Sequence, residues 1–184
     1  MKVALLGGSF DPLHLGHLLL AAELLWRYEP EALWLLPVAR HAFEKVLSPF
    51  EDRLAMADIG ARLLGPRVEA LATEQELVER GGDGATVSLL RHLTAVHRNA
   101  EFLLALGADA YAQRERWTDF ASVTQLAQVV VFNRTGVAAV AGGGPHLPAI
   151  ASSDIRTRIK DGTTIEELVP LQVRRYIQGR GLYR

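Results

Sequence analysis

A glycine-rich turn that ends in two histidines directly follows the first apolar run of the chain. Residues 3–6 form a short apolar run typical of a buried parallel strand, and Gly-Gly-Ser-Phe-Asp-Pro-Leu-His-Leu-Gly-His follows from Gly7 to His17. A second apolar run at 18–26 predicts a mostly buried helix. A strand, a glycine turn and a helix in this order bring free backbone N–H groups and the positive end of a helix dipole to one point. The chain is therefore expected to hold an anion such as a polyphosphate there.

The two histidines of this turn strengthen that prediction. His14 and His17 are three residues apart and would share one face of a first helical turn. A lone histidine is usually a packing or surface residue, but two of them after a glycine turn favour a functional site. Gly7 and Gly8 would let a ligand approach the backbone without meeting a Cβ atom.

The order of apolar segments predicts an α/β fold. Strand-like and helix-like runs alternate, with strands expected at 32–36, 67–71, 102–106 and 129–132, and helices at 51–64, 86–96 and largely over 153–178. Nearly continuous apolar strands between helices are typical of a Rossmann-like parallel sheet with helices on both faces. Ligands of such sheets bind beyond the carboxyl ends of the strands, where the Gly-Gly turn, Pro37 and the turn at 107–109 fall. Residues 1–184 are expected to be a single domain, with a small helical part at about 150–184.

The composition excludes several classes of protein. The net charge is −1 at pH 7, whereas a general nucleic-acid or membrane-surface binder usually carries a basic excess. The chain has no cysteine, so it has neither disulfides nor thiolate metal sites. No apolar run approaches the roughly twenty residues that span a bilayer, and the N-terminal run is too short for a signal peptide. We expect a cytoplasmic protein with no nucleic-acid or membrane partner, and we leave open whether it forms a homo-oligomer.

Two further segments carry groups that could contact the same anion. The loop at 37–45 offers Lys45 as a phosphate ligand, with a solvated surface lysine as the alternative. Ser152 or Ser153 could cap a helix that has Arg156 in its first turn, and such a helix start is also an anion site. The simpler interpretation of that stretch is a capped helix with a solvated arginine.

Other charged residues are expected to be less important. For Arg40 and His41, contact with a substrate and a position on the surface are equally favoured interpretations. Arg53 is expected to be a charge on a helix surface, paired with a carboxylate one turn away. Gly142–Pro145 is expected to be a surface loop, because no strand-then-helix context surrounds it.

These motifs together resemble the HxGH nucleotidylyltransferases, and the opening turn is similar to that of bacterial nicotinate-nucleotide adenylyltransferases. Ile-Ala-Ser-Ser-Asp-Ile-Arg at 150–156 resembles that family's Ile-Ser-Ser-Thr-x-Ile-Arg signature, and Gly-Ala-Asp at 107–109 with Trp117 resembles its Gly-Ala-Asp…Trp stretch. Leu-Val-Pro at 168–170 and the Val-Arg-Arg-Tyr-Ile run at 173–177 look like the family's last helices. The resemblance spans nearly the whole chain.

The resemblance implies transfer of AMP from ATP to a pyridine mononucleotide, with Mg²⁺ accompanying ATP and no metal held by protein residues alone. Such a transfer needs aligned reactants and neutralised charge rather than a covalent intermediate. The implied catalytic residues are His14, His17, Lys45 and Arg156. The implied ATP site comprises Gly7, Gly8, Ser9, Phe10, His17, Gly107, Asp109, Ser152, Ser153 and Arg156. The implied mononucleotide site comprises Ser9, Lys45, Thr86 and Trp117, with the Trp117 ring stacked on the pyridine. Arg134 would border the adenine.

Two departures from the family pattern fall where the acceptor would bind. Bacterial members carry Pro-Pro-His-Lys after the second strand, whereas Lys45 lies one residue further on, in a spacing that resembles the eukaryotic-type enzymes. The family's Gly-x-Ser-Tyr-Thr turn is represented by Gly-Asp-Gly-Ala-Thr at 82–86, without the tyrosine. Nicotinate mononucleotide is the predicted acceptor, with nicotinamide mononucleotide, or both, as the alternative. A pantetheine-phosphate adenylyltransferase and a non-catalytic nucleotide-binding regulator are less favoured alternatives.

Overall fold

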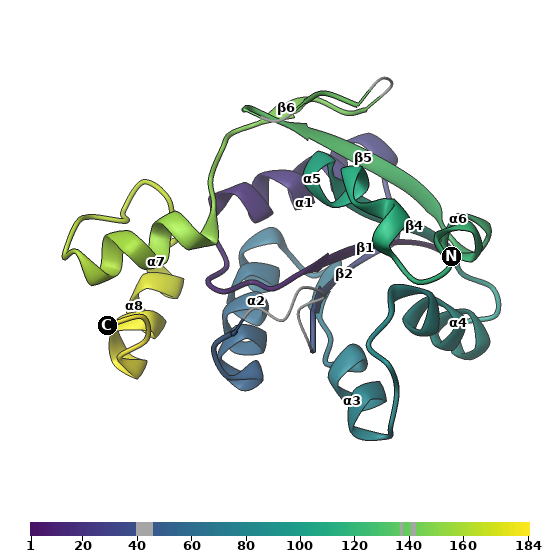
Figure 1. Ribbon diagram of the computed structural model, residues 1–184, viewed down its shortest axis with the longest axis horizontal. Coiled ribbons are helices and arrows are strands. Elements are labelled where there is room, and N and C mark those ends of the chain that lie inside the picture. Colours follow the sequence, from purple (N-terminus) through teal and green to yellow (C-terminus); the bar gives the residue numbers. More distant parts are fainter. Residues whose placement is uncertain (40–45, 137, 141–142) are drawn as a thin grey trace.

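The computed structural model describes residues 1–39, 46–136, 138–140 and 143–184 of the chain. Within these residues, six strands form a parallel sheet in the order β3-β2-β1-β4-β5-β6 (Figure 1). The strands are β1 (Lys2–Gly8), β2 (Ala32–Pro37), β3 (Val68–Ala70), β4 (Glu101–Gly107), β5 (Gln128–Arg134) and β6 (His146–Leu147). The order reverses between β1 and β4, so the loops that leave these two strands diverge and open a crevice between them.

Helices cover both faces of the sheet. The described helices are α1 (Leu15–Tyr28), α2 (Phe50–Leu64), α3 (Thr73–Glu79), α4 (Thr86–Val96), α5 (Ala108–Ala112), the 3₁₀ turn η1 (Arg114–Arg116), α6 (Phe120–Leu126), α7 (Ser152–Lys160) and α8 (Leu171–Arg180). Helices α1, α2, α7 and α8 share one hydrophobic core with the sheet, and α4 and α6 share the other. None of the described helices is both long enough and apolar enough to cross a membrane.

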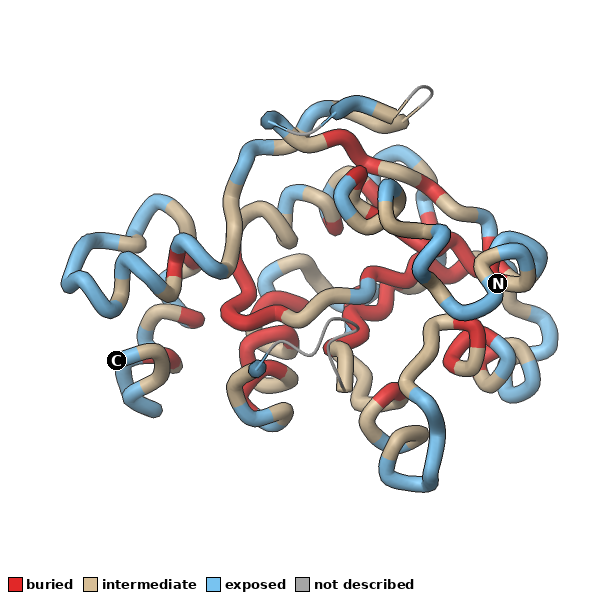
Figure 2. Tube along the Cα trace, viewed as in Figure 1, coloured by how far each residue is buried: buried red, intermediate tan, exposed pale blue. Residues whose placement is uncertain are grey.

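The alternating side chains of the central strands build these two cores. Leu6 of β1 packs in the cluster that contains Leu24 of α1, and its neighbour Leu5 packs in the cluster that contains Leu90 of α4. The buried residues follow the central strands (Figure 2). A strand buried on both faces needs an uninterrupted apolar sequence, which is why the continuous runs in this chain predicted parallel strands.

The structure confirms the predicted Rossmann-like α/β fold and changes some boundaries. The first helix begins at Leu15, three residues earlier than expected, and the segment at 153–178 is two helices, α7 and α8. Gly162 follows α7 with φ +68°, and Pro170 directly precedes α8, so the chain turns between them. The short helices α3, α5 and α6 and the two-residue strand β6 were not predicted, because elements of that length carry little periodic signal.

Candidate functional site

A cleft of ≈ 750 Å³ opens at the carboxyl ends of the central strands. It lies at the reversal point of the sheet, and its size is typical of small-molecule sites, which span about 300–1,000 Å³. The predicted site residues that line it are Gly7, Gly8, Ser9, His14, His17, Thr86, Gly107, Asp109, Trp117, Ser152 and Ser153. The cleft thus brings together residues from the ends of β1 and β4 and from the starts of α4 and α7.

The two histidines form a stacked pair at the start of α1. Their ring centroids lie 3.7 Å apart with an interplanar angle of 25°. The backbone N–H of His14 donates a hydrogen bond to Nδ1 of His17 at 3.2 Å, so in the neutral ring of His17 the proton sits on Nε2. The ring of Phe10 packs edge-on against His17 with centroids 4.9 Å apart.

Gly16 allows the His14 ring to lie on the first turn of α1. A Cβ atom built on Gly16 would come within 3.0 Å of both Cε1 and Nδ1 of His14. Real Cβ atoms rarely approach other atoms so closely, so the glycine between the two histidines is needed for this ring position. The sequence prediction treated only the glycines before the histidines as functional and missed this one.

Both histidines are neutral at pH 7. Burial lowers the pKa of His14 to about 2, and the neighbouring His17 and Arg134 add to this shift. Burial also lowers the pKa of His17 to about 3, with Arg134 contributing. Two charged rings 3.7 Å apart would repel each other, whereas neutral rings can stack and still offer N–H donors. A phosphate bound beside them would favour their protonated forms and so counteract this shift.

Arg134 ties the ends of β4 and β5 together on one side of the cleft. Its guanidinium lies 3.2 Å from Oδ2 of Asp109 and donates a second hydrogen bond to the carbonyl oxygen of Ile150 at 3.0 Å. On the other side, Trp117 packs edge-on against Phe120 with ring centroids 5.8 Å apart. The indole of Trp117 is therefore supported by the α4 side of the sheet, while it lines the cleft.

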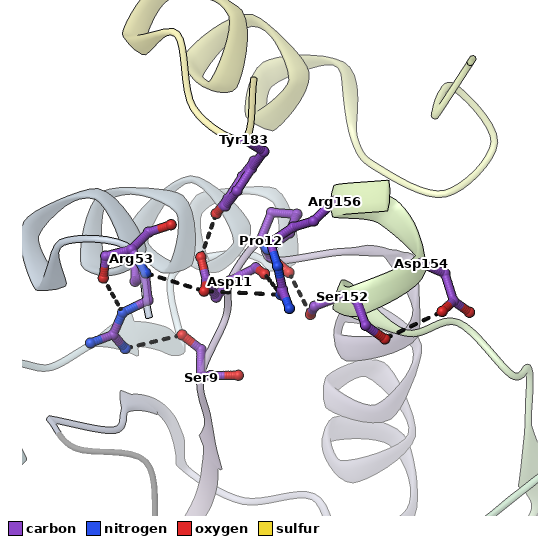
Figure 3. A network of polar contacts seen from close by, with 10 residues as sticks. Ser9, Asp11, Pro12, Arg53, Ser152, Asp154, Arg156 and Tyr183 are labelled. Carbon is purple, nitrogen blue, oxygen red and sulfur yellow. Dashed lines mark hydrogen bonds and ion pairs between the residues drawn. The ribbon is translucent and has the colours of Figure 1, made fainter. Parts of the chain in front are cut away.

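The start of α7 differs from the prediction. The helix begins at Ser152 with Ala151 at the N-cap, and neither predicted serine caps it. The hydroxyl of Ser152 instead donates to the carbonyl oxygen of Pro12 at 3.1 Å, and that of Ser153 donates to Asp154 at 3.3 Å (Figure 3). The expectation of a serine cap was wrong because Ser152 ties α7 to the turn after β1, 140 residues earlier in the chain.

Three predicted site residues lie outside the cleft wall or outside the described residues. Arg156 sits behind the turn and donates to the carbonyl oxygen of Asp11 at 2.6 Å, so it is not a solvated arginine. Phe10 is fully buried beneath His17 rather than exposed to the cleft. Lys45, together with Arg40 and His41, lies outside the described residues.

Arg53 is a buried residue that the sequence prediction placed wrongly on the surface. Its side chain is among the largest fully buried ones, and the residue is only 2% exposed. The guanidinium donates to the carbonyl oxygens of Ser9 and Ser48 at 3.1 and 3.0 Å (Figure 3) and to that of Val38 at 2.8 Å. Three carbonyls converge on this point because the chain leaves β1 at Ser9, leaves β2 at Val38 and approaches α2 at Ser48. One guanidinium can donate to all of them.

Glu74 is a buried acid at the cleft that gave no signal in the sequence. It lies in the first turn of α3, lines the cleft and accepts a hydrogen bond from the N–H of Ala39 at 2.9 Å. Burial raises its pKa to about 7, although this hydrogen bond and Arg53 oppose the shift. In the described parts of the chain, no three His, Cys, Asp or Glu side chains gather in a way that could hold a metal ion.

Comparison with known proteins gives a consistent set of similarities. A family model described as cytidylyltransferase-like matches residues 5–158. The chain is 43% identical over 183 residues to the probable nicotinate-nucleotide adenylyltransferase of Anaeromyxobacter sp. (strain K), covering 100% of this chain and 97% of that one. It is 36% identical over 183 residues to the protein of the same description in Myxococcus xanthus (strain DK1622), covering 100% and 95%.

Two solved structures share the fold. The Plasmodium falciparum nicotinic acid mononucleotide adenylyltransferase complexed with NaAD superposes with a TM-score of 0.81 at 16% identity, covering 99% of this chain and 97% of that one. The putative nicotinate-nucleotide adenylyltransferase from Vibrio parahaemolyticus superposes with a TM-score of 0.76 at 20% identity, covering 100% and 95%.

Proposed function

Because this chain belongs to the cytidylyltransferase-like family and, within it, to the nicotinate-nucleotide adenylyltransferases, we propose that it transfers AMP from ATP to nicotinate mononucleotide. The products are deamido-NAD and pyrophosphate, so the reaction belongs to NAD biosynthesis. The observation that carries this function is the stacked pair His14 and His17 at the start of α1, inside the cleft at the reversal point of the sheet.

The reaction joins two phosphates without a covalent enzyme intermediate. A phosphate oxygen of the mononucleotide attacks the α-phosphorus of ATP, the new P–O bond forms, and the bond to the β-phosphate breaks to release pyrophosphate. The imidazole N–H groups of His14 and His17 donate to phosphate oxygens on which negative charge increases. The N-terminus of α1 adds its dipole at the same point. Arg156 and Lys45 are proposed to neutralise the remaining triphosphate charge.

The two faces of the sheet support two separate subsites. Trp117 packs with the α4-side core and Thr86 begins α4, so we assign the pyridine mononucleotide to this side. Ile150 packs with the α1-side core and leads into α7, so we assign the ATP phosphates and adenine to that side, next to Arg134. The histidine pair lies on α1 at the end of β1, where the two reacting phosphates would meet.

Mg²⁺ is part of this proposal as a companion of ATP. Mg²⁺ is usually held by one or two carboxylates together with substrate phosphates and water. The acidic residues that line the described cleft are Glu74 in α3, Asp83 in the loop before α4 and Asp109 in α5, and this scatter fits a cation carried in by the triphosphate. When bound, Mg²⁺ would neutralise negative charge on the triphosphate. A cytoplasmic location, expected from the sequence, belongs to the same proposal.

A side-by-side acceptor assay tests the function. Purified protein is given MgATP and either nicotinate mononucleotide, nicotinamide mononucleotide or pantetheine phosphate, and both pyrophosphate and the dinucleotide are measured. We expect pyrophosphate release that requires an acceptor, with the highest kcat/KM for nicotinate mononucleotide. A higher value for nicotinamide mononucleotide would correct the acceptor, and no product with either pyridine mononucleotide would overturn the function.

A further inference from the structure

A buried carboxylate behind the phosphate-binding turn joins distant segments of the chain to that turn (Figure 3). Asp11 is 2% exposed and lies three residues before His14. Its Oδ1 accepts a hydrogen bond from the hydroxyl of Tyr183 at 2.6 Å, and its Oδ2 accepts one from the N–H of Ser48 at 3.2 Å. Arg156 donates from Nη1 to the carbonyl oxygen of the same residue at 2.6 Å. Three segments therefore meet at one residue.

The guanidinium of Arg156 and the carboxylate of Asp11 do not form a close ion pair. Nη1 of Arg156 lies 4.0 Å from Oδ2 of Asp11, which is longer than a close ion pair. The carboxylate is satisfied instead by two neutral donors, Tyr183 and the backbone of Ser48. Burial, reinforced by the hydrogen bond to Asp11, raises the pKa of Tyr183, so its hydroxyl keeps its proton and stays a donor at neutral pH.

We propose that Tyr183 is a positioning residue for ATP: its hydroxyl satisfies the Asp11 carboxylate, so that Arg156 is not drawn onto that carboxylate. The guanidinium then stays anchored through Nη1 on the carbonyl oxygen of Asp11 and keeps its remaining N–H groups for the triphosphate. This inference rests on the function proposed above, in which the triphosphate binds at the start of α7. Without the hydroxyl, Oδ1 of Asp11 would be a buried charge with a missing donor, which is costly. Arg156 already lies 4.0 Å from the other carboxylate oxygen and would turn toward Asp11, away from the ligand.

The chain offers a closely matched control in a second Tyr–Asp–Arg group. The hydroxyl of Tyr176 donates to Oδ1 of Asp52 at 2.8 Å, and Nε of Arg180 lies 2.8 Å from the same oxygen. Asp52 is also 2% exposed, but this group joins α2 to α8, and among the described residues no hydrogen bond or ion pair links it to the turn at 7–17. Tyr176→Phe therefore removes the same hydroxyl from the same type of pair without a predicted effect on ATP.

The experiment compares ATP binding and steady-state kinetics in wild type, Tyr183→Phe, Tyr176→Phe and the double variant Tyr183→Phe/Asp11→Asn. The Kd for MgATP is measured by calorimetry without an acceptor, and the KM values for ATP and nicotinate mononucleotide are measured separately. Tyr183→Phe is expected to weaken ATP binding about tenfold, as the loss of one hydrogen bond to a charged group would, and to raise the KM for ATP similarly. The KM for the mononucleotide and the ATP affinity of Tyr176→Phe should change less than about twofold.

The double variant tests the capture of Arg156 directly. Asp11→Asn removes the charge that would attract the guanidinium, so ATP affinity should return to within about threefold of wild type. This variant also decides the question if Tyr183→Phe alone does not fold. The inference is overturned if Tyr183→Phe changes ATP affinity no more than Tyr176→Phe does, or if the double variant binds ATP as weakly as Tyr183→Phe. Binding of ATP without product formation from any acceptor would instead overturn the proposed function and leave the Tyr183 comparison valid.

Discussion

Replacing Gly16 by alanine should lower the catalytic rate while leaving the stability of the fold nearly unchanged. The new Cβ atom would lie 3.0 Å from Cε1 and Nδ1 of His14, whereas ordinary contacts begin at 3.4 Å, so the ring must move by a few tenths of an ångström. That movement would disturb the 3.7 Å stack with His17. Because a misplacement of about 1 Å can cost about a hundredfold in rate, a movement of a few tenths of an ångström should lower kcat about fourfold to tenfold.

The same substitution should leave the protein folded. Gly16 is the second residue of α1, and Gly→Ala in a helix stabilises by about 0.4–1 kcal/mol where the backbone accepts it. This gain offsets part of the cost of moving His14, so the free energy of unfolding should change by less than about 1 kcal/mol. Gly179→Ala is the matched control, because Gly179 lies in α8 and a Cβ atom there meets no atom within 4 Å.

The assay is pyrophosphate release at saturating MgATP and nicotinate mononucleotide, with urea unfolding of the same samples. We expect Gly179→Ala to retain wild-type kcat, while Gly16→Ala loses activity at nearly unchanged stability. If Gly16→Ala keeps its kcat within about twofold of wild type, the position of the His14 ring does not control the reaction and the reasoning fails.

Two further predictions concern the buried polar groups. Arg53→Met leaves three buried carbonyl groups without their donor. At about 1 kcal/mol for each lost hydrogen bond, it should lower the free energy of unfolding, measured in urea, by about 3 kcal/mol. A loss below about 1 kcal/mol would be typical of a surface charge and would contradict the buried role of Arg53. Burial lowers the pKa values of His14 and His17 to about 2 and 3, so between pH 6.5 and about 3 the unfolded chain binds protons that the native protein does not, and native stability falls with falling pH. In the variant His14→Gln/His17→Gln, the free energy of unfolding should depend less steeply on pH, by up to about 1.4 kcal/mol per pH unit for each histidine removed. Equal slopes for variant and wild type would show that the histidines titrate normally.

The sequence predicted the features that depend on residues close together in the chain. The strands β1, β2 and β4 are continuous apolar runs, so their burial on both faces could be read without knowing their partners. The parallel sheet then brings their carboxyl ends to one edge, which placed the histidine turn and the turn at 107–109 beside one cleft.

The contacts behind the cleft could not be predicted in this way. Arg53 looks like a surface residue in a helix sequence, and only the packing of α2 against the ends of β1 and β2 turns it inward. Tyr183 and Asp11 are 172 residues apart, so no local pattern links them. The hydroxyl of Ser152 is equally suited to a helix cap and to a tertiary hydrogen bond. It forms the tertiary bond because the carbonyl oxygen of Pro12 lies within reach.

The kcat of His17→Ala tests the central claim most directly, because that claim assigns adenylyl transfer to the histidine pair at the start of α1. Wild type, with MgATP and nicotinate mononucleotide, should form one dinucleotide for each pyrophosphate released. His17→Ala, verified as folded, should show a kcat lower by about 10²–10³, the usual cost of losing one donor to the transition state. A His17→Ala protein that keeps the wild-type kcat would contradict the account.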